Sequence, residues 1–377
     1  MLIGILKEHK EFEKRVALSP TVAASLIKEG FEITIESGAG DSSYFVNDDY
    51  SNAGVKISTD KNAIYQSADI ILKVNAPSTE EIQLMKKDAV LISFAWAQTN
   101  PDLVEAAAKQ GISLCSMDAI PRISRAQKMD ALSSQSNLAG YKTVIMGANA
   151  LGKIFPMLMT AAGTIRPAKV VIMGAGVVGL QAIATANRLG AIVEVSDIRP
   201  ETKEQIESLG GKFIELDEAS DAKTEGGYVK DVSDEFLKKQ QALIAKHVSA
   251  ADLVITTALI FGKKAPLLVT EDMVKNMQNG SVLVDIAVEQ GGNCEISEYG
   301  KTVVKHGVTI IGEPNLPSLL PLNASELYAK NISAFLLHLT NENAIQWDMN
   351  DEITAGALIT HQGNIVHPSL KKDLQLN

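Results

Sequence analysis

A glycine triplet between two β-rich runs constrains the fold more than any other feature of this chain. In KVVIMGAGVVGLQAIATANRLGAIVEVSD, Gly174, Gly176 and Gly179 form the pattern G-x-G-x-x-G. The triplet follows a valine- and isoleucine-rich run and opens a helical pattern, and a second β-rich run ends at Asp197. In such a βαβ unit the glycines make a tight turn, admit a pyrophosphate and let helix and strand pack closely. The segment predicts a dinucleotide site at the positive end of a helix.

The acidic residue that ends the second run indicates which dinucleotide binds. Asp197 can accept a hydrogen bond from a ribose 2′-hydroxyl and would repel a 2′-phosphate, which favours NAD over NADP. Arg199, two residues later, slightly weakens that preference. GAGDSS, residues 38–43, lacks a third glycine at the required spacing and is interpreted as a turn. The predicted cofactor-binding residues of this region are Gly174, Ala175, Gly176, Val177, Gly179, Asp197, Ile198 and Arg199.

The alternation of β-rich and helical runs predicts an α/β protein with two Rossmann-like, doubly wound parallel-sheet domains. In the second domain the expected strands are 169–173, 192–197, 212–216, 252–258, 281–287 and 308–313. They are largely apolar, as strands buried on both faces should be. One helix is expected over 270–280, with Thr270 as its N-cap and Gly280 just past its end.

The first 120 residues repeat this alternation more weakly. Strands are expected at 2–6, 32–35, 70–73, 90–94 and 113–116. The tail contains a helical run, 325–339, and ALITHQGNIVHP, which predicts a hairpin turning at Gly363–Asn364. Because the tail is too short for its own core, we expect it to pack on the first domain. The predicted domains are 1–130 plus 325–377, which is discontinuous, and 131–324, with long helices joining them.

Composition excludes several classes of protein. With 377 residues, the chain can hold two domains with full cores. The net charge of −10 argues against nucleic-acid binding, which requires a basic face. The two cysteines, Cys115 and Cys294, lack metal-ligand spacing, and no metal is predicted. No secretory signal is recognised, and no apolar run of 18 residues appears. The nearest, 137–165, is interrupted by lysines and is interpreted as a buried helix.

Two polar segments require an explanation. PRISRAQKMDALSSQSN, residues 121–137, concentrates charged and amide side chains just before a helical run. It is either a solvated loop or a site for a charged ligand. Residues 217–235 form a long polar stretch with Gly226, Gly227 and a lone Tyr228. Its composition fits a disordered loop and a lid over bound nucleotide equally well.

The histidines bear on the type of reaction. A dehydrogenase that oxidises an alcohol or amine needs a general acid–base group, because a proton leaves with the hydride. None of the six histidines is expected near a strand end with an obvious carboxylate partner, apart from the tail pair His361 and His367. Hydride transfer between two nicotinamide rings requires no such group. The protein has only to hold two rings in contact and exclude water.

The sequence resembles a known family over essentially its whole length. PRISRAQKMDALSSQSNLAGYKTVI, the GAGVVG triplet, TTALIFGKKAPLLVTEDMV, VDIAVEQGGNCE and NIVHP are similar to the NAD(H)-binding domain I, the first portion of the alpha subunit, of proton-translocating NAD(P) transhydrogenase. Alanine dehydrogenase is a related family that shares RVALSP, residues 15–20. The segment that carries that family's catalytic histidine reads SFAWAQ here, with Trp96 at the histidine position. Glu289 replaces its aspartate in DIAVEQGG, whereas Lys73 matches a substrate-binding lysine.

The resemblance implies roles for individual residues. Arg122 and Ser133 would hold the nicotinamide carboxamide or a nearby phosphate, and Asp130 would orient the carboxamide and Arg122. Gln127 would reach the ribose of the NADP site; these four are the predicted catalytic residues. Arg125 would bind cofactor or brace the loop. The remaining predicted cofactor contacts are Gly227, Tyr228, Gln240 and Leu259.

The resemblance also implies a larger assembly. The enzyme is a Re/Si-specific NAD(P)⁺ transhydrogenase, active only as a complex, that couples hydride transfer from NADH to NADP⁺ with proton translocation. NADP(H) would sit on a partner subunit, and membrane-embedded subunits would carry the proton channel. The chain would be a cytoplasmic homodimer, peripheral to the bacterial inner membrane. Two alternatives remain: an NAD-dependent alanine or amino-acid dehydrogenase, and a non-catalytic NAD-binding sensor.

Overall fold

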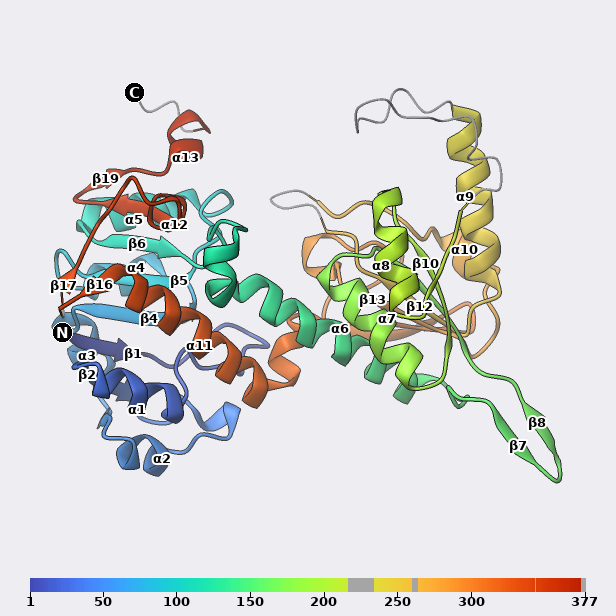
Figure 1. Ribbon diagram of the computed structural model, residues 1–377, viewed down its shortest axis with the longest axis horizontal. Helices are drawn as coiled ribbons and strands as arrows, with labels where there is room; N and C mark the ends of the chain where they lie inside the picture. The colour runs from blue at the N-terminus through green and yellow to red at the C-terminus, as the bar shows by residue number, and fades with distance from the viewer. Residues whose placement is uncertain (216–233, 260–263, 343, 374–377) are drawn as a thin grey trace. The chain divides into compact units, whose positions relative to one another are not determined.

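The computed structural model describes residues 1–215, 234–259, 264–342 and 344–373. The chain divides into two compact units (Figure 1). Unit 1 comprises Met1–Gln135 and Pro317–Asn377, and unit 2 comprises Ser136–Leu316. Of the two long helices expected to join the units, α6 (Ala131–Ala150) crosses a boundary, whereas α11 (Pro321–Leu339) begins after one and lies in unit 1.

Unit 1 is built on an eight-stranded sheet of order β19-β18-β6-β5-β4-β1-β2-β3. Strands β1 to β6 run parallel, and β18 pairs antiparallel with β6, so the tail completes this sheet. The strands are β1 (Leu2–Ile5), β2 (Glu32–Glu36), β3 (Lys56–Ser58), β4 (Ile70–Asn75), β5 (Val90–Phe94), β6 (Ser113–Ser116), β18 (Leu358–His361) and β19 (Asn364–Ile365). The helices are α1 (Pro20–Lys28), α2 (Asn47–Asn52), α3 (Lys61–Ser67), α4 (Thr79–Leu84), α5 (Pro101–Gln110), α11, α12 (Glu352–Ala357) and α13 (Pro368–Asp373).

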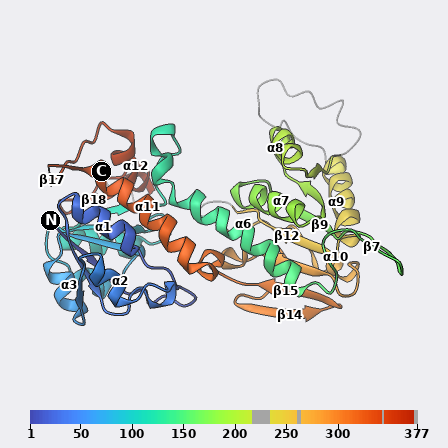
Figure 2. The same cartoon turned by 60° about the horizontal axis from the view of Figure 1, so that its bottom comes forward.

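Unit 2 is built on a seven-stranded sheet of order β11-β10-β9-β12-β13-β15-β14. Only β14 is antiparallel, and Figure 2 shows it beside β15 at the sheet edge. The strands are β9 (Lys169–Met173), β10 (Ile192–Ser196), β11 (Lys212–Phe213), β12 (Leu253–Thr256), β13 (Val282–Asp285), β14 (Lys301–Lys305) and β15 (Val308–Gly312). The helices are α7 (Val177–Arg188), α8 (Lys203–Ser208), α9 (Asp234–Ser249) and α10 (Glu271–Lys275).

Both sheets bury side chains on both faces, which explains their continuous apolar runs. In β9, Val170 and Ile172 pack with α7, whereas Val171 and Met173 pack with α9 and α10. Strand β4 divides its side chains between two cores in the same way. The prediction of two Rossmann-like, doubly wound α/β domains is confirmed.

Strand order fixes where a ligand can bind in each unit. The order reverses between β1 and β4 in unit 1, and between β9 and β12 in unit 2. Ligands of open parallel sheets bind outside the carboxyl ends of the strands at such reversals. The segments that follow β9 and β12 are therefore the first place to look for a dinucleotide site.

The prediction of one buried helix over 137–165 is wrong. Helix α6 ends at Ala150, and β7 (Leu158–Thr160) and β8 (Gly163–Ile165) form an exposed antiparallel hairpin that projects from unit 2 (Figure 1). Pro156 cannot continue a helix, because it has no backbone N–H to donate. Gly163 has φ +134°, a conformation that other residues rarely adopt. Proline and glycine therefore override the apolar composition.

Two further boundaries differ from the predictions. Thr270 caps α10 as expected, with its hydroxyl accepting from the Met273 N–H, but the helix ends at Lys275. The side chain of Asn276 donates to the carbonyl of Asp272 and competes with continued helix. The tail hairpin turns at Gln362–Gly363, one residue earlier than predicted. Both residues have positive φ, the requirement of a tight two-residue turn.

A buried ionic cluster lies at the strand reversal of unit 1. Arg15 Nη2 is 2.7 Å from Glu13 Oε2, and Lys73 Nζ is 3.6 Å from Glu8 Oε2. Arg15 also donates to Gln135 Oε1 at 2.9 Å. Burial alone would raise the pKa of Glu13, but the Arg15 guanidinium outweighs it and lowers the pKa to about 2. Burial dominates at Glu8 and raises its pKa despite Lys73.

The Glu13–Arg15 pair predicts an acid-sensitive stability. Because the pKa of Glu13 falls from 4.5 to about 2 on folding, its contribution is present above pH 4.5 and is lost as pH falls toward 2. The shift corresponds to about 3 kcal/mol. Denaturant unfolding of the wild type and Glu13→Gln should show the stability difference between them shrinking over that pH range. A difference that does not change with pH would contradict the assignment.

Candidate functional site

The glycine turn after β9 has the geometry of a phosphate cradle. Gly174 has φ +109°, and a Cβ there would lie 2.5 Å from Thr257 Oγ1. A Cβ on Gly179 would lie 1.9 Å from the carbonyl oxygen of Gly174, so α7 packs directly on the turn. At Gly176, by contrast, a Cβ would meet no atom within 4 Å. Two glycines therefore permit close packing, and the middle one faces open space where a pyrophosphate fits.

The N-terminus of α7 supplies the attraction for an anion. Gly176 is the N-cap, and no side chain caps the helix there. The first N–H groups of a helix lack intrahelical partners, and the helix dipole adds a partial positive charge. Ala175 and Val177 lie on this turn, and Ala175 is buried. The residues fit the phosphates of a dinucleotide.

Asp197 lies just past the end of β10 and is already fully engaged. Its carboxylate accepts from the Ala175 N–H at 2.6 Å, the Arg199 N–H at 2.9 Å and the Arg199 guanidinium at 3.0 and 3.1 Å. Burial alone would raise the pKa of Asp197, but its hydrogen bonds to Arg199 outweigh that effect and lower it. Ile198 is 88% exposed beside it. A ribose hydroxyl would take the place of a guanidinium contact on this carboxylate.

Thr257 is a residue that the sequence analysis missed. It follows β12, and its hydroxyl lies 3.2 Å from the Met173 carbonyl and 3.0 Å from the Gly174 carbonyl, where it can donate to either oxygen. It thus ties the two strand ends on either side of the reversal. A hydroxyl residue that directly follows a buried strand in a glycine-triplet unit could have identified it.

The remaining predicted contacts of unit 2 are only partly described. Leu259 is 46% exposed, two residues after Thr257. Gln240 belongs to α9. Gly227 and Tyr228 lie outside the described residues, as does most of the polar stretch 217–235.

The polar segment of unit 1 forms a short 3-10 helix, η2 (Ser124–Met129), followed by α6. Arg122 and Gln127 are both exposed. Within the described ranges, neither side chain has a hydrogen-bond or ion-pair partner. Both side chains are therefore available to a ligand or a partner protein.

Arg125, Asp130 and Ser133 have structural contacts instead. Arg125 Nη2 is 3.0 Å from Asp351 Oδ1 on the N-cap of α12. The Asp130 carboxylate accepts from the N–H of Ser133 at 2.8 Å and from its hydroxyl at 2.5 Å, which caps the start of α6. Asp130 has no hydrogen bond or ion pair with Arg122 among the described residues. Arg125 therefore has the bracing contact that the resemblance allowed.

Asn331 of α11 is a second residue that the sequence analysis missed. Its amide donates to the Lys128 carbonyl at 2.8 Å, and its oxygen accepts from the Ser134 hydroxyl at 2.7 Å. It therefore holds η2 against α11. Nothing in the sequence connects α11 with the polar segment, because some two hundred residues separate Asn331 from Lys128.

The expectation that no histidine outside the tail has a carboxylate partner is wrong. His247 pairs with Glu194 at 2.6 Å, His306 with Glu271 at 2.7 Å, and His338 with Asp351 at 2.9 Å. The tail histidines contact serines instead. In unit 2, however, both pairs lie toward the amino ends of the strands. Lys169, at the start of β9, joins the Glu194 pair, and His306 lies directly before β15. They are thus at the opposite edge of the sheet from the glycine turn.

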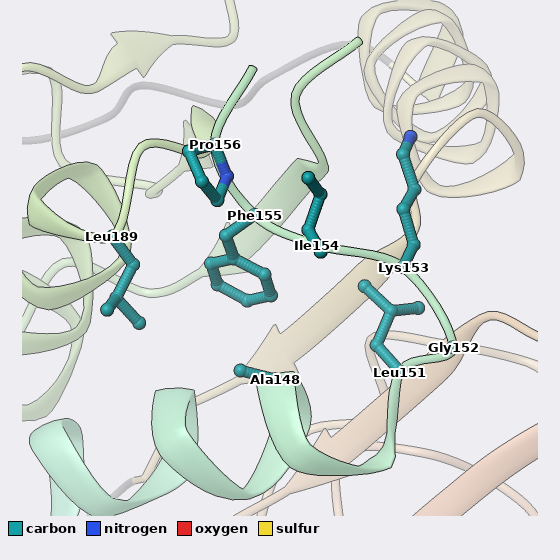
Figure 3. A pocket seen from close by; sticks show the side chains of 8 residues that line it. All are labelled: Ala148, Leu151, Gly152, Lys153, Ile154, Phe155, Pro156 and Leu189. Carbon is teal, nitrogen blue, oxygen red and sulfur yellow. The ribbon is translucent and has the colours of Figure 1, made fainter. Parts of the chain in front are cut away.

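A separate hollow lies at the other end of α7. It has a volume of about 490 Å³ and is lined by Ala148, Leu151, Gly152, Lys153, Ile154, Phe155, Pro156 and Leu189 (Figure 3). Leu189 follows the last turn of α7, whereas the glycine turn precedes the first. This mostly apolar hollow is therefore distinct from the predicted cofactor site.

Two further searches cover only the described residues of the chain. Among those residues, no three histidine, cysteine, aspartate or glutamate side chains gather as metal ligands would. Within the same ranges, no helix combines the length and apolar character that a membrane crossing requires.

Comparisons with known proteins agree with this geometry. Residues 4–139 match the N-terminal domain of alanine dehydrogenase/PNT, and residues 143–368 match its C-terminal domain. The first portion of the NAD(P) transhydrogenase subunit alpha of Rhodospirillum rubrum, a separate chain, is 49% identical, covering 98% of this chain and 99% of that protein. Alanine dehydrogenase of Bacillus subtilis is 30% identical, with coverage of 99% and 95%.

Solved structures give the same result. Transhydrogenase from Sinorhizobium meliloti superposes with a TM-score of 0.88 at 43% identity, covering 97% of this chain and 100% of that one. An L-alanine dehydrogenase superposes with a TM-score of 0.82 at 29% identity, with coverage of 100% and 99%. The chain therefore belongs to the alanine dehydrogenase/PNT family, in which it is similar over nearly its whole length to the first portion of the NAD(P) transhydrogenase subunit alpha.

Proposed function

We propose that this chain is the NAD(H)-binding subunit of a proton-translocating transhydrogenase. It would hold NADH while a hydride passes directly to NADP⁺ on a partner subunit. The observation that carries the proposal is the open cradle at Gly176, bounded by the close-packed Gly174 and Gly179. The relatives named as transhydrogenase subunits support the reaction.

Direct hydride transfer fits the groups at the cradle. Bound NADH supplies the hydride, with the bonding electron pair, from its dihydronicotinamide ring, and no proton is released. The chain therefore needs no general acid or base at the reacting carbon. The histidine–carboxylate pairs of unit 2 lie at the opposite sheet edge, which agrees with this requirement. The task of the chain is to position the ring and exclude water.

The proposed roles follow the available side chains. The glycine turn and α7 hold the pyrophosphate, Asp197 with Ile198 and Arg199 receives the ribose, and Leu259 lies toward the nicotinamide. Arg122 would bind the carboxamide, and Gln127 would reach the partner's nucleotide. Asp130, Ser133 and Arg125 keep the segment in shape through their contacts.

The partners are proposed from the same family relation. Two relatives bear names that make them one portion of a subunit alpha, and such names indicate further subunits. We place NADP(H) on one of these subunits and the proton channel on membrane-embedded ones. This chain would then be held at the cytoplasmic side of a bacterial inner membrane.

We also propose a homodimer, supported by the β7–β8 hairpin. Its apolar side chains are far from buried: Met159 is 72% exposed, Met157 59% and Leu158 45%. An isolated two-stranded hairpin is marginally stable in water, so a second protein surface is expected to cover it. Sedimentation of the purified chain should give the dimer mass, and Met159→Asp should shift it toward the monomer.

An alanine or amino-acid dehydrogenase is the second candidate. At the position where the resemblance places that family's histidine, the structure has Trp96. Its backbone φ is +48°, and its ring stacks on Phe94 with centroids 5.8 Å apart. The Asp118 carboxylate accepts from the N–H groups of Ala95 and Trp96. An indole cannot exchange a proton with the substrate, which disfavours this candidate.

The function is tested by mixing the purified chain with an NADP-binding partner subunit. Hydride exchange between NADH and an oxidised NADP analogue is expected only in the mixture, followed by absorbance. The chain alone should not reduce NAD⁺ with alanine. NADH binding without exchange would favour the sensor, and alanine-dependent reduction would favour the dehydrogenase.

Gln127→Asn is expected to slow hydride transfer about tenfold or more, because shortening the side chain disturbs alignment of the two nucleotides. NADH affinity should change less than about twofold, since Gln127 is proposed to act across the interface. Gln83→Asn, an exposed position on α4, is the matched control and should change neither. Equal losses of rate and affinity in Gln127→Asn would contradict this role.

Asp197→Ala should weaken NADH binding roughly tenfold or more, because it removes a charged acceptor. It should also relax discrimination against NADPH, since the negative charge facing a 2′-phosphate is gone. Asp197→Asn separates the effect of charge from that of side-chain size. Unchanged relative affinities for NADH and NADPH, measured by fluorescence titration, would show that another residue selects the dinucleotide.

A further inference from the structure

Asn293 is an amide with no exposed surface, and its side chain binds a single loop. Its oxygen accepts from the Ala258 N–H at 3.0 Å, and its nitrogen donates to the carbonyls of Ala258 at 2.9 Å and Pro266 at 2.8 Å. One carboxamide therefore holds both Ala258 and Pro266. It lies in the GGNCE segment, to which the proposed function assigns no role.

The main chain at Asn293 is fixed by a buried carboxylate. Asp285, at the end of β13, accepts from the N–H groups of Asn293 at 3.1 Å and Cys294 at 3.0 Å. It also accepts from the hydroxyls of Thr256 at 3.2 Å and Ser297 at 2.7 Å, and from the Ala287 N–H at 3.1 Å. A buried carboxylate needs several donors when it lacks a cation, and Asp285 has no ion pair with a described residue. Asn293 is thus held rigidly.

The loop that Asn293 holds runs past the cofactor cradle. Ala258 stands between Thr257, whose hydroxyl contacts the carbonyl of Gly174, and Leu259, which is exposed. Two residues therefore fix this stretch from opposite sides. Thr257 joins it to the glycine turn, and Asn293 joins it to the end of β13.

We propose that Asn293 is a positioning residue for the nicotinamide end of the bound dinucleotide. Through Ala258 it sets the place of Leu259, while the glycine turn and Asp197 hold the pyrophosphate and adenosine. This inference rests on the proposed function, because it requires NADH in the cradle.

An amide is well suited to this position. It offers an acceptor to the Ala258 N–H and two donors to carbonyls, without bringing a second charge near Asp285. A smaller apolar side chain would leave three buried main-chain groups without partners. The loop would then shift to satisfy them, and Leu259 would move with it.

The test compares two probes that share the adenosine and pyrophosphate. In Asn293→Ala, the NADH dissociation constant should rise about tenfold, the equivalent of one or two lost hydrogen bonds. ADP lacks the nicotinamide and its ribose, so its dissociation constant should change less than about twofold. Asn293→Ser keeps one polar group and should show the same selective loss to a smaller degree, should the alanine variant fail to fold.

Asn187→Ala is the matched control. Asn187 also donates its amide to a main-chain carbonyl, that of Leu209 at 3.1 Å, but at the other end of α7. Neither probe should change affinity there. Equal losses of NADH and ADP binding in the Asn293 variants, or no loss, would overturn this inference alone. Failure of the unaltered chain to bind NADH would overturn the proposed function and this inference with it.

Discussion

The contact between Gly179 and the carbonyl of Gly174 is the constraint on which the rest of unit 2 depends. No side chain fits there, since a Cβ would lie 1.9 Å from that oxygen. Helix α7 can therefore rest against the end of β9, and its N-terminus opens at the strand reversal. The anion site, the position of Asp197 and the role of Thr257 all follow from this approach. In unit 1 the reversal lies instead beside an ionic cluster whose charges are paired within the chain.

The core strands could be predicted because they are apolar and continuous, and burial on two faces leaves no other composition. Strands β3 and β14 were missed, since they lie at sheet edges and carry lysines and partly exposed side chains. The β7–β8 hairpin was mistaken for helix because apolar content outweighed Pro156 and Gly163. Local turn geometry depends on single residues and does not appear in the average over a segment.

The candidate site was predictable where a motif binds through its own backbone, as the glycine turn does. It was not predictable where one side chain serves a distant segment. Asn331 reaches Lys128, and Asn293 reaches Ala258 and Pro266, across separations that no spacing rule covers. Asp130 and Arg125 show the reverse case, since their charges suggest ligand contacts while their measured partners are other segments of the scaffold.

The guanidinium of Arg199 on Asp197 has a kinetic consequence. An incoming ribose must displace a partner that is tethered two residues away and always ready to return. Association therefore exchanges one charged contact for another, and the net gain in free energy is modest. When the oxidised nucleotide leaves, the arginine closes over the carboxylate again and no bare charge is exposed. Such an internal substitute shortens the lifetime of the complex, which suits a carrier that has to reload after every transfer.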